Sequence, residues 1–437
     1  MNHSETPIEG RAFPGGVARI TAAEQAFLLS LQRQALTYFL DNQSAGGLMR
    51  DRQANRAPHR MLGWCSTAAT GMGLIALALA AAPPYRLLER DMAVHRVRLA
   101  LNAALERVPH DHGIMPHFLD SHTDELRGHD AYSTVDSSWL LAGALWAAEF
   151  LKDPALEELA QHLYQRVDWY YWTDPHSSDS GLLRHGKGCD GRFLPYYWDH
   201  FNGETVAMYV MSAGATVDRA VPPKAMAALK PFYGTVAGLR FNNADLGLFT
   251  FEYGLDLLDL RCWRSPGADL AAEASIATRA NYLFCKQQAE HFLTYRYFWG
   301  LSNGDGPDDP PQRDSYRARS PHLPIDGTAQ LTDTLAAVAH APAEVLENLE
   351  RAEHDHVLRA RGRYGFSPVN LDRHWVGQDM VGIDAGAAVL ALDNYLMNNR
   401  VRRVFHALPC VHHGLQRLGF IGVEKVAPPL TVEDDPL

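Results

Sequence analysis

The stretch STAATGMGLIALALAAA, residues 66–82, decides the fold because it carries no charged side chain on any face. A helix that is apolar all round must be covered by other elements on every side. Its apolar run reaches about 15 residues before the next proline, short of the roughly 20 that a bilayer needs, so we expect a buried helix and no membrane partner. Three later stretches are almost as apolar: DSSWLLAGALWAAEFL (136–151), ETVAMYVMSAGA (204–215) and DAGAAVLALDNYLM (384–397).

Amphipathic segments alternate with these apolar ones. They carry charges on one side only, which is typical of helices that face solvent. They are TAAEQAFLLSLQRQALTYFL (21–40), RDMAVHRVRLALNAALERV (90–108) and PALEELAQHLYQRVDWYY (154–171). We expect the amphipathic helices to form an outer layer and the apolar helices an inner one. Their alternation along the chain predicts an all-α fold, an (α/α)6 barrel in which long loops form a cleft at one end.

The second half of the chain is less regular but still predicts helices. We expect them near 223–232, 270–290, 327–339, 342–353, 384–398 and 412–418. Long loops rich in Gly, Pro, Asp and aromatic residues follow Thr173 and Asn303, and loops of this length are usually functional. Since no linker separates two cores, we expect an arm over 1–20, one catalytic domain over 21–420 and a tail over 421–437.

Composition excludes several classes of protein. The net charge of -11, without a long run of Lys or Arg, argues against nucleic acid as a partner. The cysteine count is five, without C-x-x-C spacing, which predicts reduced thiols rather than disulfides or a zinc cluster. The start of the chain shows no secretion signal, so we expect a cytoplasmic protein, or a periplasmic one if a signal was removed. The oligomeric state is left open.

Three carboxylates stand at the openings of apolar helices: Asp136, Glu204 and Asp384. One interpretation is helix capping, because a carboxylate accepts backbone N–H bonds there. The other is catalysis, because inner helices of one orientation begin at the same mouth of a barrel and bring their carboxylates together. Hydrolysis of a glycoside needs two carboxyl groups. Helix N–H groups would keep the pKa of Asp384 low, as suits a base, while Trp198 and Phe201 would raise that of Glu204, as suits an acid.

Aromatic residues in the loops favour a sugar ligand, because their rings can stack on sugar faces. Trp198, Trp299, Trp375 and the pair Tyr196 and Tyr197 lie near these carboxylates or in long loops. The histidines lack metal-ligand spacing and the acidic loop after Asn303 lacks the EF-hand order, so we expect no metal. Nucleotide-binding and serine-hydrolase motifs are also absent from the sequence, so we expect no cofactor.

The order of motifs along the chain resembles that of the bacterial glucoamylase-like proteins. That group includes the endo-β-1,2-glucanases of glycoside hydrolase family 144 and the C-terminal domain of cyclic β-1,2-glucan synthases. The matching motifs are GGLMRDR from Gly46, STAATGMGL from Ser66, HGIMPHFLD from His112, STVDSSWLLAGAL from Ser133, WDHFNGETVAMY from Trp198, WGLSNGDGP from Trp299, DGTAQ from Asp326, RYGF from Arg363, VGIDAGAAVLALDNY from Val381 and GLQRLGF from Gly414.

The resemblance implies an (α/α)6 fold, no required metal and a cleft that acts on β-linked glucose chains. It implies that Glu204 is the general acid, that Asp384 activates the attacking water or hydroxyl, and that Asp136 binds or supports the substrate. The residues that we expect to contact substrate are Arg52, Trp139, Trp198, Tyr253, Trp299, Asp305 and Trp375.

The sequence departs from the family pattern at three places, which leaves the sugar and its linkage open. Ala131 and Tyr132 stand where the family has an acidic residue, FEYGLDLLD from Phe251 replaces an H-Q-Y-S-H motif, and GETVAM replaces N-E-A-M. We expect an inverting glycoside hydrolase that acts on β-1,2-glucan or its oligosaccharides. A transglycosylase and a non-catalytic glycan-binding protein are the alternatives.

Overall fold

The protein is largely helical in the computed structural model, as its sequence predicts. The model describes residues 20–56, 63–177, 179–307, 316–355 and 357–422. The predicted arm and tail lie almost entirely outside the described residues. The helix after the arm begins with a capping box, in which Thr21 accepts the backbone N–H of Glu24 and Glu24 accepts that of Thr21.

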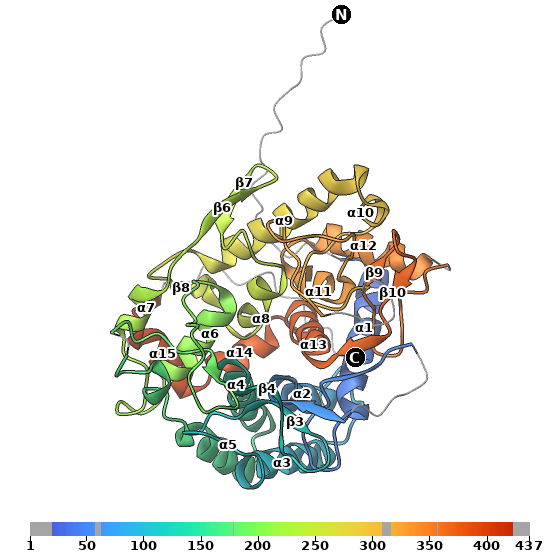
Figure 1. Ribbon diagram of the computed structural model, residues 1–437. Helices are drawn as coiled ribbons and strands as arrows, with labels where there is room; N and C mark the ends of the chain where they lie inside the picture. The colour runs from blue at the N-terminus through green and yellow to red at the C-terminus, as the bar shows by residue number, and fades with distance from the viewer. Residues whose placement is uncertain (1–19, 57–62, 178, 308–315, 356, 423–437) are drawn as a thin grey trace, which may run out of the picture.

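Six helices have nearly all of their residues buried and surround the centre of the molecule (Figure 1). They are α2 (Thr67–Ala80), α4 (Thr134–Leu151), α6 (Gly203–Ala213), α8 (Phe249–Leu257), α11 (Leu331–Ala336) and α13 (Gly382–Leu396). Amphipathic helices with one exposed face lie outside them: α1 (Ala22–Asp41), α3 (Arg90–Glu106), α5 (Pro154–Arg166), α9 (Leu270–Gln287), α12 (Pro342–His354) and α15 (Pro409–Arg417). The predicted alternation of outer and inner helices therefore holds through residue 215.

Neighbouring inner helices contact one another in sequence, with α2 on α4, α4 on α6, α6 on α8, α8 on α13, and α13 on both α11 and α2. Glycines permit the closest approaches. A Cβ at Gly71 would lie 2.1 Å from the carbonyl oxygen of Trp139, and one at Gly254 would lie 1.8 Å from that of Gly203. These contacts bring α4 against α2 and α8 against α6, and they fix the start of α6 relative to α8.

The second half differs from the prediction in its details. Helix α8 was not predicted, because a stretch buried on all sides shows no amphipathic period and its first residue follows Leu248, which provides no side-chain cap. Two short helices, α10 (Leu293–Tyr297) and α14 (Arg400–His406), were also missed. The helix predicted at 223–232 is only α7 (Lys224–Ala228), and the one predicted at 327–339 begins at α11.

Short strands, which the sequence analysis did not predict, occur in the segments that connect the helices. A four-stranded antiparallel sheet has the order β2 (Trp64–Ser66), β3 (Pro116–Asp120), β4 (Leu126–Ser133), β5 (Gly186–Lys187). The other pairs are also antiparallel: β1 (Arg52–Ala54) with β11 (Asp379–Val381), β6 (Tyr233–Val236) with β7 (Leu239–Asn242), β8 (Trp263–Arg264) with β12 (Ile421–Gly422), and β9 (Val369–Asn370) with β10 (Trp375–Val376).

The cysteines are free thiols, as predicted, with Cys65 and Cys285 buried. Across the residues that the model describes, no helix is both long and apolar enough to cross a membrane.

Candidate active site

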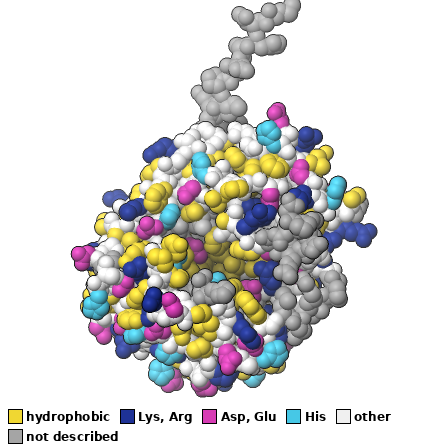
Figure 2. All heavy atoms as spheres, in the orientation of Figure 1, with side chains coloured by type: hydrophobic (Ala, Val, Ile, Leu, Met, Phe, Trp, Pro, Cys, Tyr) yellow, Lys and Arg dark blue, Asp and Glu magenta, His cyan; other side chains and the backbone are white. Residues whose placement is uncertain are grey.

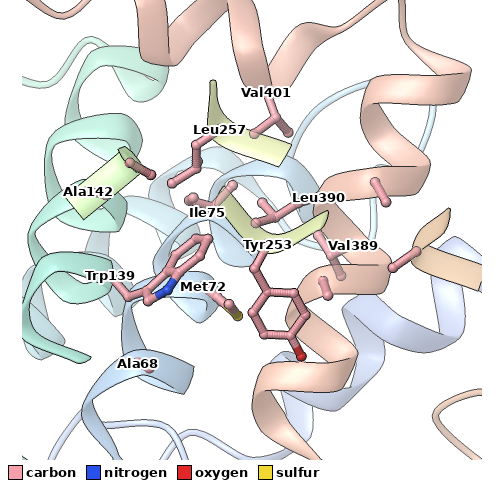
Figure 3. Close-up of a cluster of buried hydrophobic side chains, with 14 of the residues drawn as sticks. Ala68, Met72, Ile75, Trp139, Ala142, Tyr253, Leu257, Val389, Leu390 and Val401 are labelled. Carbon is pink, nitrogen blue, oxygen red and sulfur yellow. The ribbon is translucent and has the colours of Figure 1, made fainter. Parts of the chain in front are cut away.

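A cavity of about 930 Å³ opens where the inner helices α4, α6 and α13 begin. Figure 2 shows it as a hollow lined mainly by hydrophobic side chains near the centre of the face. Ala68, Met72, Trp139 and Tyr253 line the cavity, and Figure 3 shows them lower in the view than Ile75, with which they belong to one cluster of buried hydrophobic side chains. The core of the inner helices is therefore also the floor of the site.

Each of the three predicted carboxylates lies in the first turn of an inner helix, and none is the capping residue. The capping side chains are Ser133 for α4 and Asn202 for α6, while α13 has no side-chain cap. Asp136 and Glu204 line the cavity, and Asp384 follows Ile383, which also lines it. None of the three is therefore the N-cap residue of its helix, and Asp136 and Glu204 lie at the cavity wall, whereas Asp384 is buried beside it.

Glu204 is buried at the cavity wall, and no donor in the described part of the chain is within hydrogen-bonding distance of its carboxyl group. Burial, and secondarily the charge of Asp136, raises the pKa of Glu204 to about 8. The prediction of a raised pKa at this position agrees with that value. A carboxyl group in this state holds its proton at neutral pH.

Asp136 is the second carboxylate on this side of the cavity. It accepts a short hydrogen bond from the Ser133 hydroxyl, and the nearer ring nitrogen of His117, Nε2, lies 3.6 Å from its Oδ1. These two neighbours hold the Asp136 carboxylate in place beside Glu204.

Asp384 differs from its prediction, because its pKa is raised rather than lowered. Burial is the largest cause, followed by the nearby charges of Asp333 and Asp305. A hydrogen bond of 3.2 Å from the Tyr253 hydroxyl to Oδ1 and the charge of Arg52 act in the opposite direction. The backbone N–H groups of the first turn, which would lower the pKa of Asp384, therefore have a smaller effect than the acidic residues that α11 and the loops bring close.

Arg52 is the cation nearest to Asp384 among the residues that line the cavity. Arg52 is the first residue of β1. This strand pairs with β11, which directly precedes α13, and Arg52 lies opposite Val381 in the pairing. Its guanidinium group lies 3.0 Å from Asp305, 3.3 Å from Asp51 and 4.0 Å from Asp379. Asp305 is buried behind Arg52 and orients it, and is not itself among the lining residues.

The aromatic residues divide into two groups. Trp139, Trp198 and Tyr253 line the cavity as predicted, and the Trp198 ring stacks on His185 with centroids 3.9 Å apart. The other two tryptophans expected to contact substrate, Trp299 and Trp375, are not among the lining residues. Trp299 is buried between α9 and α12, where its indole nitrogen donates to the Glu344 carbonyl, and Trp375 lies on the β10 strand.

Several lining residues were not among the predicted ones. They include His117 on β3, Phe249 at the start of α8, and His185, Asn202 and Tyr316 outside the helices and strands, and helical periodicity marks none of them. A usable signal existed only for Asn202, which precedes Glu204 by two residues and is a preferred capping type. In the described residues, no group of three or more His, Cys, Asp or Glu side chains is arranged to hold a metal ion.

Fold and site together define a class: a largely helical protein whose inner helices bring carboxylates to one aromatic cavity. A family model named Glycoamylase, described as “Putative glucoamylase”, matches residues 195–409, which include Glu204 and Asp384. The predicted resemblance to the glucoamylase-like proteins is thereby confirmed. No curated protein matches the sequence.

Solved structures share the fold over nearly the whole chain. The endo-beta-1,2-glucanase of Chitinophaga pinensis, in complex with sophorotriose and glucose, has a TM-score of 0.79 at 19% identity, covering 92% of this chain and 99% of that one. The Talaromyces funiculosus endo-beta-1,2-glucanase with sophorose gives 0.64 at 12% identity, covering 87% and 85%. A D-mannose isomerase gives 0.52 at 11% identity, covering 87% and 100%.

Proposed function

We propose that this protein is an inverting glycoside hydrolase that cleaves β-1,2-glucan or its oligosaccharides. The observation that carries the proposal is the buried carboxyl group of Glu204 at the wall of an aromatic cavity, with Asp136 on the neighbouring inner helix α4 and Asp384 in the first turn of the inner helix α13. The relatives with bound sophorose and sophorotriose support the linkage. A fold shared with an isomerase does not by itself choose the reaction, so the argument depends on these side chains.

In the proposed reaction Glu204 is the general acid. Its proton passes to the glycosidic oxygen, which leaves as a hydroxyl group as the bond to the anomeric carbon breaks. Asp384 is the general base, which takes a proton from the attacking water while that water bonds to the anomeric carbon. Arg52 and the Tyr253 hydroxyl stabilise the ionised form of Asp384, and Asp136 binds substrate beside the acid.

The architecture belongs to the same proposal. We place the inner helices α2, α4, α6, α8, α11 and α13 as the inner ring of an (α/α)6 barrel, within one catalytic domain over residues 21–420. The contacts between successive inner helices and the outer layer of amphipathic helices support this arrangement. Trp139 and Trp198 are the aromatic residues that would stack on sugar rings in the cavity.

The test is digestion of linear β-1,2-glucan, followed by chromatography of the products. Since acid–base assistance contributes about 10² to 10⁴-fold, Glu204→Gln and Asp384→Asn should each lower kcat by at least about 10²-fold with the fold intact. The matched control is Glu252→Gln, because Glu252 is also buried, on α8, but is not among the lining residues. Near-normal turnover in both site variants would disprove this assignment.

Two further measurements separate acid from base and hydrolysis from transfer. A glycosyl fluoride needs no protonation of its leaving group, so it should partly restore activity to Glu204→Gln and not to Asp384→Asn. Adding an acceptor sugar should leave the products unchanged for a hydrolase and should give longer chains for a transglycosylase. Glycan binding without any turnover would identify a non-catalytic protein.

A further inference from the structure

One face of the small sheet leads from the cavity to the surface. In the pairing of β2 with β3, Ser66 lies opposite Phe118 and Trp64 lies opposite Asp120. Side chains alternate between the two faces of a strand. Cys65 and Leu119 fill the core face, where both are completely or almost completely buried, so these four side chains share the other face. Ser66 and Phe118 line the cavity, while Trp64 lies further out.

An irregularity in β3 adds His117 to this face. The register with β4 shifts between Pro116 and Phe118, and a bulge of this kind turns an extra side chain to one side. The His117 ring stacks on Phe118, with centroids 3.8 Å apart, and both rings line the cavity. Since His117 also lies 3.6 Å from Asp136, the row of rings starts beside the proposed catalytic carboxylates.

The outer end of the row is exposed to solvent. Trp64 is 45% exposed, and its ring centroid lies 5.5 Å from that of Phe118. An ion pair between Asp120 and Arg127, 2.8 Å long, borders the same rings, with Arg127 opposite Phe118 in the β3–β4 register. Aromatic faces contact the C–H groups of sugars, and charged groups hydrogen-bond their hydroxyls, so the two chemistries that a glycan requires occur together here.

We infer that His117, Phe118, Trp64 and the Asp120–Arg127 pair form a glycan track that binds the part of a β-glucan chain lying outside the cavity. The inference rests on the proposed function and deepens it. A longer chain makes more contacts with the track, so the track favours long β-glucan chains over short oligosaccharides as substrates. An isolated tryptophan on the surface would have no contact with the cavity, whereas the Trp64 ring contacts Phe118, which lines it.

The experiment measures kcat/KM for Trp64→Ala on β-1,2-glucans of increasing length, from the trisaccharide to the polymer. Loss of one stacking ring should lower kcat/KM on the polymer about threefold to tenfold and leave the trisaccharide unaffected. Trp64→Tyr should retain most of the wild-type value on the polymer. The matched control is Tyr170→Ala, which removes an equally exposed aromatic side chain, 46% exposed, that does not line the cavity.

The outcomes distinguish this inference from the function on which it depends. If the wild-type protein cleaves no β-1,2-glucan of any length, the proposed function fails. If it cleaves them and Trp64→Ala changes all lengths by the same factor, or none, the glycan track is wrong. Equal melting temperatures of Trp64→Ala and wild type show that the loss on polymer is not a folding defect.

Discussion

At the scale of single residues, two glutamates show what allows a buried carboxyl group to act as a general acid. Glu204 and Glu252 are both buried on neighbouring inner helices, and burial raises the pKa of each. Glu204 lies in the first turn of α6, where the cavity reaches it, while Glu252 lies in α8 away from the lining. Burial favours the protonated form of both carboxyl groups, but of the two only Glu204 lines the cavity, where it can donate a proton to a ligand.

The pH dependence of activity follows from the pKa of Glu204. A general acid must be protonated, so kcat/KM should fall as pH rises through about 8, the value to which burial raises this pKa. A pH profile of the wild-type enzyme on β-1,2-glucan checks the position of this basic limb. The limb should disappear from the residual activity of Glu204→Gln and persist in that of Asp384→Asn. If the basic limb persists in Glu204→Gln, it must be caused by the ionisation of another group.

At the scale of elements, the packing of α11 against α13 sets the ionisation of Asp384. Burial is the largest cause of the raised pKa of Asp384, and the charge of Asp333 on α11 is the next largest. Burial also raises the pKa of Asp333, to about 7. Because the charge of Asp333 raises the pKa of Asp384, the ionisation of Asp384 depends on that of Asp333.

Asp333→Asn removes the charge that opposes ionisation of Asp384. The pKa of Asp384 should fall, and because a general base must be ionised, the acidic limb of the pH profile should move to lower pH. Asp256→Asn is the control, since it replaces another buried aspartate whose charge is not among those that shift Asp384. An acidic limb that stays in place in Asp333→Asn would contradict the coupling.

The contact between α6 and α8 holds Glu204 in place and gives a second element-scale prediction. A Cβ at Gly254 would lie 1.8 Å from the Gly203 carbonyl oxygen, so Gly254→Ala must push the helices apart. Overpacking of this kind costs about 1–3 kcal/mol, and it displaces the residue after Gly203, which is Glu204. We expect a lower melting temperature and a lower kcat together. Gly63→Ala, with open space around the added methyl, should change neither.

At the scale of the whole molecule, the site depends on contacts between the N-terminal and C-terminal parts of the chain, which close the ring of helices. The amide of Gln32 on α1 donates to the Val389 carbonyl on α13 at 3.0 Å, and β1 pairs with β11. These contacts place Arg52, from the first part of the chain, beside Asp384, from the last. The site therefore exists only when the entire ring is assembled.

We expect a single cooperative unfolding transition as a consequence of this closure. Thermal unfolding followed by circular dichroism, which reports helices, should coincide with unfolding followed by fluorescence of the nine tryptophans, which include Trp139 and Trp198 in the cavity. Two separated transitions would show independent domains and would contradict the proposal of one catalytic domain.

The sequence by itself determined the helical class, the alternation of buried and exposed helices through residue 215, and the first-turn positions of Asp136, Glu204 and Asp384. These properties are local, because the period of apolar residues along a helix reports which faces are covered. Only the tertiary structure decided which side chains reach the cavity. It packed Trp299 away against α12 and brought in His117 from β3 and Tyr316 from a loop. It also reversed the expected pKa shift of Asp384, because Asp333 and Asp305 approach from distant parts of the chain, and electrostatic interactions depend on separation in space rather than in sequence.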